Sequence, residues 1–161
     1  GQAMGIAKIK FNTGHFDRFT GDLAAELAKL PLDQIEMNVE NDQTPASGTV
    51  SAIQAFLKAA HQATSADIGY VYDLGNWAFT HGDATAAARA LAPDTHYIHL
   101  KNTSDQNGQL ATTADLDTGL YDWRELLKLL PHDVQFALEY PMATDAEITQ
   151  QLQLLRAEVG D

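Results

Sequence analysis

Short apolar runs recur along the chain, and each is about as long as a β-strand and bounded by Gly, Pro, Asp or Asn. Five runs are predicted to be strands: Ala7–Phe11, Ile35–Glu40, Ile68–Asp73, His96–Leu100 and Val134–Tyr140. Between them lie segments whose apolar residues have helical spacing. These segments predict helices at Gly21–Leu30, Thr49–Ala63, Ala84–Leu91, Trp123–Leu130 and Asp145–Val159, with Thr144 as the N-cap of the last one.

This alternation of strands and helices is typical of βα units around a parallel sheet. We therefore predict an α/β fold with one domain over residues 1–161. Five strands are fewer than the eight of a closed βα barrel, so the pattern leaves open a small open sheet or part of a (β/α)8 barrel. The weakly patterned stretch Thr103–Gly119 follows the fourth strand, and we expect a functional loop there.

Composition narrows the classes of partner. The net charge is −12, and the basic residues are scattered, which argues against a nucleic-acid partner because phosphate binding depends on Lys and Arg. The absence of cysteine excludes disulfides and thiolate metal ligands, and it favours a cytoplasmic location. No apolar stretch approaches the roughly 18 residues of a membrane span, and residues 1–5 lack the features of a signal peptide.

The ends of four consecutive predicted strands carry the candidate chemistry: Glu40, Asp73, His99 and Glu139. In parallel α/β folds the carboxyl ends of the strands converge, so these side chains are expected to meet. The period of two along a strand supports this arrangement. On the fourth strand, for example, His99 shares a face with Lys101, opposite His96 and Ile98. A polar inner face with an apolar outer face favours a barrel mouth.

Three carboxylates and one imidazole suit Mn²⁺, Mg²⁺, Co²⁺ or Zn²⁺ without selecting among them. A divalent ion can polarise a substrate carbonyl and its neighbouring hydroxyl and so stabilise an enediolate, while a carboxylate moves the proton on carbon. Each residue taken alone has a structural explanation, such as a solvated loop carboxylate, a structural histidine or a turn. Their occurrence at four consecutive strand ends favours a common site.

Four further residues are predicted to bind substrate: Lys10, Asn76, Trp77 and Lys101. Lys101 lies two residues beyond His99 on its face, and Lys10 can reach the mouth from the first strand. Strand-end lysines are commonly solvated, and Trp77 is equally suited to the core or to a lid over the pocket.

The strand-end motifs resemble those of the xylose isomerase-like TIM barrels. The motifs are Glu40-Asn41-Asp42, Asp73-Leu74-Gly75-Asn76-Trp77, His99-Leu100-Lys101-Asn102 and Leu138-Glu139-Tyr140-Pro141, together with Gly119–Trp123. The resemblance covers nearly the whole chain and corresponds to strands four to eight of such a barrel. It implies a divalent metal held by Glu40, Asp73, His99 and Glu139. In the epimerase branch of the family it also implies that Glu40 and Glu139 exchange the substrate proton.

The resemblance therefore predicts a metal-dependent isomerase or epimerase of a small sugar or sugar phosphate. The sequence departs from the epimerases at Asn76, where they usually have His, and at Lys101-Asn102, where their motif ends in Arg. The extra histidines of the endonuclease branch are missing, so metal-dependent cleavage at abasic sites is a less favoured alternative. The other alternative is a catalytically silent fragment that binds a sugar or self-associates through unpaired strand edges.

The start of the chain bears on this alternative. Residues 1–6 resemble the end of the helix before the fourth strand of the barrel, so we expect the chain to begin inside a longer protein. The edges of Ala7–Phe11 and Val134–Tyr140 would then lack partners, and unpaired edges invite association.

Overall fold

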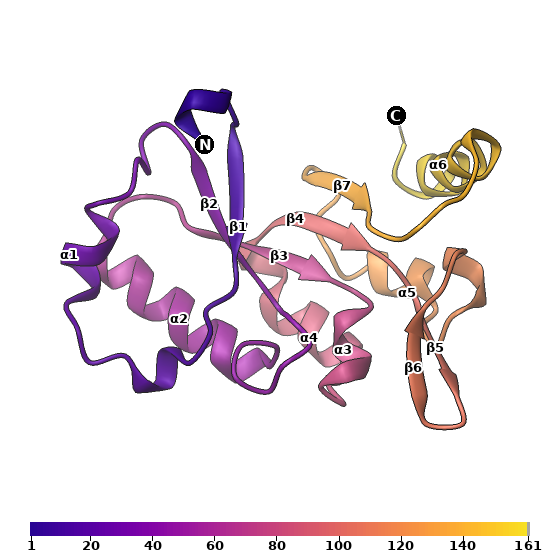
Figure 1. Ribbon diagram of the computed structural model, residues 1–161, viewed down its shortest axis with the longest axis horizontal. Helices are drawn as coiled ribbons and strands as arrows, with labels where there is room; N and C mark the ends of the chain where they lie inside the picture. Colours follow the sequence, from indigo (N-terminus) through magenta and orange to yellow (C-terminus); the bar gives the residue numbers. More distant parts are fainter. Residues whose placement is uncertain (161) are drawn as a thin grey trace.

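The computed structural model describes residues 1–160 and contains a parallel sheet of five strands (Figure 1). The strands are β1 (Lys8–Phe11), β2 (Glu36–Glu40), β3 (Gly69–Asp73), β4 (Thr95–Leu100) and β7 (Gln135–Leu138), paired in this order. All five strands that the sequence predicts are confirmed, with ends shifted by at most two residues. Because the strands are consecutive and parallel, their carboxyl ends lie along one edge of the sheet.

Helices connect the strands, as the sequence predicts. They are α1 (Leu23–Leu27), α2 (Val50–Ala63), α4 (Ala84–Leu91), α5 (Trp123–Leu127) and α6 (Asp145–Val159), with an unpredicted short helix α3 (Asn76–Phe79). Short 3-10 helices lie at Gln2–Met4, Phe16–Arg18, Ala92–Asp94 and Leu116–Thr118. The predicted cap Thr144 is confirmed, since its hydroxyl accepts from the Glu147 amide and the Glu147 carboxylate accepts from the Thr144 amide.

Two helices are shorter than predicted. Helix α1 ends at Leu27 and α5 at Leu127, three residues before the predicted ends. Beyond each end the Leu30 amide donates to the Leu27 carbonyl, and the Leu130 amide donates to the Leu127 carbonyl. In each bond an amide donates to the carbonyl three residues earlier, as in a 3-10 turn. Each helix therefore ends in a tighter 3-10 turn just before the following proline.

The core lies between the outer face of the sheet and its helices, and Figure 1 shows α2 and α4 on the same side of the strands. Val39, Tyr72 and Ile98 point from the strands into this layer, and Ile53 of α2 and Leu91 of α4 meet them from the helices, all of them almost completely buried. Within residues 1–160 no helix covers the other, inner face. The result is a curled half-barrel with a polar interior.

The stretch Thr103–Gly119, predicted as a loop, contains an antiparallel hairpin of β5 (Thr103–Gln106) and β6 (Gln109–Thr112). Its turn is Asn107-Gly108, and both residues have positive φ, 56° and 85°. An Asn-Gly pair is the preferred turn of a two-residue hairpin because both residues tolerate this conformation. The expected loop therefore contains a hairpin, whose turn signal was present in the sequence, and its functional role stays a prediction.

The prediction that the His96 side chain points to the outer face of the sheet is also wrong. Tyr70 pairs with Thr95 and Val71 with Tyr97, so His96 is an extra residue in a bulge of β4. Its ring lies over Gly69, where a Cβ atom would come within 2.1 Å of His96 Nδ1. His96 therefore points to the inner face near the amino end of the sheet. A uniform period of two cannot describe a bulged strand.

The search for membrane segments covered residues 1–160, and none of their helices is both long and apolar enough to cross a bilayer.

Candidate metal centre

The four predicted ligands meet at the carboxyl edge of the sheet. Glu40 ends β2, Asp73 ends β3, His99 lies in β4 and Glu139 directly follows β7. One ligand atom from each residue lies within 4.8 Å of the others. The register explains the meeting, since Asp73 pairs with His99 and the Glu139 amide donates to the Leu100 carbonyl. The strands thus bring together side chains that are up to 99 positions apart in the sequence.

The centre is deep on one side and open on the other. Asp73, His99 and Glu40 are 0%, 5% and 6% exposed, whereas the Glu139 side chain is 40% exposed. His99 Nδ1 lies 2.8 Å from Glu40 Oε1 and 3.4 Å from Glu139 Oε2. Both glutamates therefore reach the same imidazole atom, and a ligand would enter past Glu139.

Asn41 fixes the position of Asp73, and the sequence analysis did not single it out for this role. Its side chain donates to the Asp73 carbonyl at 2.9 Å and accepts from the Asp73 amide at 2.9 Å. It also accepts from the Tyr70 hydroxyl, and it is completely buried. An asparagine directly after a strand-end ligand was the available signal, because its amide can bond both polar groups of a neighbouring backbone.

Burial and close charged neighbours shift the pKa values of the candidate ligands. Burial raises the pKa of Asp73 to about 7, against the opposing effect of Lys101. Burial alone would lower the pKa of His99, but hydrogen bonds to Glu139 and Glu40 outweigh burial and raise that pKa to about 9. Hydrogen bonds from His99 and Lys101 hold the pKa of Glu139 well below its usual range. The two carboxylates thus favour the protonated form of the imidazole.

Two lysines complete the charge pattern. Lys10 Nζ lies 2.7 Å from both oxygens of Glu40 and 3.1 Å from Glu139 Oε1. Lys101 Nζ lies 2.7 Å from Asp73 Oδ2 and 3.0 Å from Glu139 Oε2. Burial lowers the pKa of each lysine, but the neighbouring carboxylates raise it by more. The pKa of both lysines is therefore raised. Each ammonium group therefore bridges two of the candidate metal ligands.

The donor set fits a divalent cation. Asp73 Oδ2 is buried and has no hydrogen-bond partner within residues 1–160, although the Lys101 ammonium is an ion-pair neighbour. A buried carboxylate oxygen is costly unless a cation compensates it, a role that Lys101 fills here at 2.7 Å and that a bound divalent ion could take over. Three carboxylates and one imidazole within 4.8 Å also match the ligands that Mn²⁺, Mg²⁺, Co²⁺ and Zn²⁺ take in proteins.

A cleft of about 400 Å³ opens beside the centre. Its walls include Lys10, Lys101 and Asn76, three of the residues predicted to bind substrate. The Asn76 carboxamide accepts from Gln43 Nε2 and donates to the Asn41 carbonyl, so it also braces the wall. The other side chains that line the cleft are Asn12, which shares the face of Lys10 on the first strand, and Asp42, Gln43 and Thr44, which the sequence analysis did not name as site residues. Three of these directly follow the strand that ends in Glu40, which was the available signal.

Trp77 lies apart from this cleft. It is 1% exposed and packs in the core, with its ring 6.1 Å from that of Tyr72. Tyr72 points to the outer, helix-covered side of β3, and its hydroxyl donates to the Ala84 carbonyl at the start of α4. The structure thus places Trp77 behind the site, where it supports α3, and it does not line the cleft.

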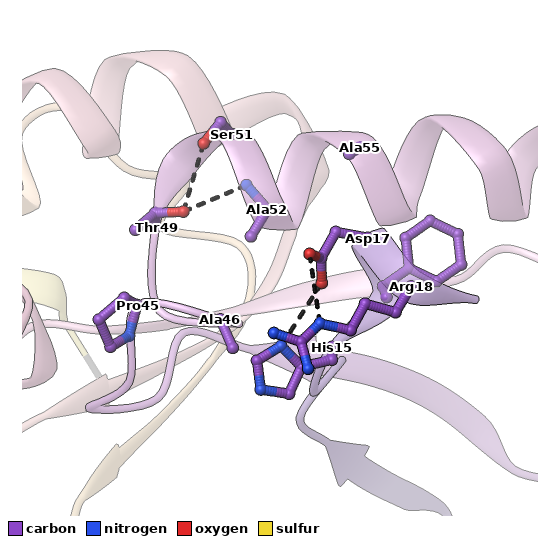
Figure 2. Close-up of a pocket in the computed structure, with 10 residues that line it drawn as sticks. His15, Asp17, Arg18, Pro45, Ala46, Thr49, Ser51, Ala52 and Ala55 are labelled. Carbon is purple, nitrogen blue, oxygen red and sulfur yellow. Dashed lines mark hydrogen bonds and ion pairs between the residues drawn. The ribbon is translucent and has the colours of Figure 1, made fainter.

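A larger cavity of about 550 Å³ lies between the segment after β1 and the start of α2. Figure 2 shows that Asp17 pairs with both His15 and Arg18, at 3.5 Å and 4.0 Å. Thr49 caps α2 by accepting from the Ala52 amide. The cavity contains none of the four candidate ligands, and its charged groups already have partners, so its size alone does not make it the functional site.

At the level of sequence, no protein-family model and no curated protein matches the chain. Solved structures are similar in fold. One is AsbF from Bacillus anthracis, described as a probable 3-DHS dehydratase involved in petrobactin synthesis. AsbF aligns with a TM-score of 0.68 at 13% identity, and the alignment covers 94% of this chain and 63% of AsbF. A xylose isomerase-like TIM barrel protein from Mycobacterium smegmatis, in complex with magnesium, aligns with a TM-score of 0.60 at 18% identity, covering 84% and 51%.

A third similar structure is the IolI protein with a bound zinc atom, which has a TM-score of 0.58 at 13% identity and covers 98% of this chain and 64% of IolI. This chain thus spans about half to two thirds of the length of these structures. At such identities the likeness concerns the fold. With its five parallel strands and alternating helices, the chain therefore has a fold similar to part of a xylose isomerase-like TIM barrel.

Proposed function

We propose that this chain carries the active site of a divalent-metal-dependent isomerase or epimerase acting on a small sugar or sugar phosphate. The observation that carries the proposal is the meeting of three carboxylates and one imidazole at the carboxyl edge of the sheet. The magnesium and zinc in two structures of similar fold support a divalent ion as cofactor. The proposed ligands are Glu40, Asp73, His99 and Glu139.

A divalent ion at this centre would polarise a substrate carbonyl and its neighbouring hydroxyl, which favours loss of a proton through an enediolate. Glu40 and Glu139 are the proposed acid–base pair that removes this proton and returns it. Both contact His99 Nδ1, so both reach the middle of the centre. Glu40 is shielded from water and Glu139 is not, and this difference would let Glu139 exchange its proton with solvent.

The cleft residues are proposed to hold the substrate. Lys10 and Lys101 line the cleft with ammonium groups that can donate to substrate oxygens. Asn76 lies in the wall and is proposed to orient a hydroxyl, with Trp77 packed behind it in α3. These roles follow from position and donor chemistry.

Calorimetric titration with Co²⁺ tests the metal centre. We expect one ion per chain, with binding weakened at least about 100-fold in Glu139→Gln and His99→Ala, since each variant removes a ligand. Glu36→Gln is the matched control, because Glu36 shares the inner face of β2 but lies at the amino end and pairs with Lys8. Absence of binding in the parent, or equal binding in all variants, would contradict the proposal.

Proton exchange tests the chemistry. With Mn²⁺ or Co²⁺ and a panel of aldoses, ketoses and their phosphates in D₂O, proton NMR should show deuterium entering the carbon beside the carbonyl. Glu40→Gln and Glu139→Gln should stop this exchange, and Glu36→Gln should leave it unchanged. A chain that binds metal and sugar without exchange would instead be the catalytically silent fragment that the sequence analysis left open.

The unpaired edges favour self-association as a second property. Within residues 1–160, β1 and β7 each pair on one side only. Phe11 on β1 is 43% exposed, and Ile148 and Leu152 on α6 are 39% and 37% exposed. Free strand edges beside exposed apolar side chains promote pairing between chains. Sedimentation velocity over a hundredfold range of concentration should show a dimer or larger species, and a monomer throughout would exclude this property.

A further inference from the structure

The oxygens that would bind a metal ion are already bonded to two lysines. Lys10 holds both oxygens of Glu40 and one of Glu139, and Lys101 holds the other oxygen of Glu139. Lys101 is also the ion-pair neighbour of Asp73 Oδ2. A divalent ion that uses these carboxylates must therefore compete with two ammonium groups. Binding of the ion releases the lysines from at least some of these contacts.

The released charges need a new partner. Three carboxylates and two ammonium groups leave one negative charge when His99 is a neutral ligand. Among these contacting groups, a divalent ion would change the balance to one positive charge, in a centre where three of the four ligands are almost completely buried. Asp42 in the cleft wall is not counted, since its carboxylate is bonded to Thr44 and Ser47. Unbalanced charge is costly at such a place. A ligand with a single negative charge restores neutrality, whereas a neutral sugar does not.

The cleft also argues against a phosphate group. None of the residues that line it is an arginine, and Asp42 adds a negative charge to its wall. A phosphate monoester carries between about 1.5 and 2 negative charges at pH 7, more than the surplus that the metal creates. A carboxylate carries one charge, and two lysine ammonium groups can bond both of its oxygens.

The side chains of the two lysines differ in how freely they can move. The Lys101 stem packs on Gly75, where a Cβ atom would come within 2.7 Å of Lys101 Cγ, and its side chain is 11% exposed. The Lys10 side chain is 38% exposed. Lys101 is therefore held close to the centre, while Lys10 can swing into the cleft.

We propose that a divalent ion displaces Lys10 and Lys101 from its ligands and that the two lysines then bind the carboxylate of a small, monoanionic sugar acid that keeps its carbonyl, such as a uronate. Ion and substrate accordingly bind with positive cooperativity. The inference rests on the proposed metal centre and narrows its substrate class.

The first experiment titrates Co²⁺ into the parent, Lys10→Met, Lys101→Met and Lys8→Met. Methionine keeps most of the stem and removes the charge. Loss of either competing ammonium should tighten Co²⁺ binding on the order of tenfold, because a cation and a competitor for the same oxygens are removed together. Lys8 is the matched control, since it lies on the same strand and pairs with Glu36 at 3.0 Å, and its variant should bind like the parent.

The second experiment measures binding of D-glucuronate, D-glucose and D-glucose 6-phosphate with and without saturating Co²⁺, with circular dichroism to verify folding of each variant. Glucuronate should bind the Co²⁺-loaded parent at least about tenfold more tightly than the metal-free parent and more tightly than the other two compounds. The Lys10→Met and Lys101→Met variants should lose this coupling, and Lys8→Met should keep it.

The outcomes separate the two proposals. If Co²⁺ binds neither the parent nor any lysine variant, the metal centre itself is wrong and the inference falls with it. If Co²⁺ binds all four proteins equally, or if glucose or glucose 6-phosphate binds the loaded parent as tightly as glucuronate, the inference is overturned and the metal centre stands. Binding of Co²⁺ only in Lys10→Met and Lys101→Met supports the competition.

Discussion

His99 Nδ1 lies 2.8 Å from Glu40 Oε1, although β3 separates their two strands. Strands two positions apart in a sheet are about 10 Å apart. The two side chains meet because the sheet is curled and both point to its concave inner face. The contact couples the protonation of a histidine in β4 to a carboxylate at the end of β2, and this coupling has measurable consequences.

The stability of the metal-free protein should fall as the pH rises from about 6.5 to 9. The pKa of His99 is raised from 6.5 to about 9 in the folded protein, so folding favours the protonated ring. This stabilisation is complete below pH 6.5 and is lost as the pH rises through about 9. A loss of about 2 kcal/mol in the free energy of unfolding is expected over this range. Urea unfolding with a chelator present measures it.

A matched pair of variants isolates this effect. His99→Gln should flatten the pH dependence above 6.5, whereas His15→Ala should leave it unchanged because His15 is exposed and lies far from the centre in the sequence, paired with the exposed Asp17. Asp73 adds a slope of the same sign at lower pH, since its pKa is raised from 3.8 to about 7. A free energy of unfolding that rises between pH 6.5 and 9 would show that His99 is not held as a cation.

Metal affinity should change with pH in the opposite sense. Only a neutral imidazole binds a metal, so the proton on His99 must leave when the ion binds. With a pKa of about 9 for His99, the apparent affinity for Co²⁺ should rise about tenfold per pH unit between 6.5 and 8.5. Calorimetry in buffers of different ionisation enthalpy would also count the released proton. An affinity independent of pH would exclude His99 as a ligand.

Asn41→Ala should destabilise the protein by about 3 kcal/mol, because it removes the partners of the Asp73 amide, the Asp73 carbonyl and the Tyr70 hydroxyl in a buried place. Co²⁺ binding should weaken as well, since Asp73 loses the groups that position it. Asn12→Ala is the control, as Asn12 lines the same cleft but is exposed. Chemical unfolding and calorimetry on both variants test this, and equal stability of Asn41→Ala and the parent would refute the positioning role.

Much of this arrangement was readable from the sequence because it depends on local rules. Apolar runs of strand length marked the five strands, and the residues at their carboxyl ends included all four side chains that meet at the centre. The ligand set required only that consecutive parallel strands end at the same edge. Neither long-range packing nor exact strand ends had to be known.

Other features depend on contacts that the sequence does not display. His96 changes face because one extra residue bulges from β4 over Gly69, and the apolar pattern gives no sign of it. Trp77 lies in the core because α3 turns it towards Tyr72, whereas strand-end position suggested the pocket. The lysine bridges to Glu139 join Lys10 of β1, Lys101 directly after β4 and Glu139 directly after β7, so they appear only when the sheet is assembled.

Gly119→Ala should destabilise the segment that carries the β5–β6 hairpin into α5. A Cβ atom at position 119 would come within 2.0 Å of Asn102 Cγ. Asn102 is fully buried and donates to the Leu116 and Tyr121 carbonyls, so it cannot move without breaking these bonds. Since Gly119 has φ −100°, which other residues also adopt, the clash is the only reason for the glycine. We expect a loss of about 2–4 kcal/mol in the free energy of unfolding.

A double-mutant cycle tests this cause. Asn102→Gly removes the whole side chain that a methyl group at position 119 would meet, including the Asn102 Cβ atom at 2.5 Å that Asn102→Ala would leave in place. Adding Gly119→Ala to Asn102→Gly should therefore cost less than about 0.5 kcal/mol, far below its effect in the parent. Thr118→Ala is the neighbouring control, since Thr118 is exposed and its hydroxyl donates only to the Asp115 carbonyl. Equal costs of Gly119→Ala in the two backgrounds would show that contact with Asn102 is not what requires a glycine.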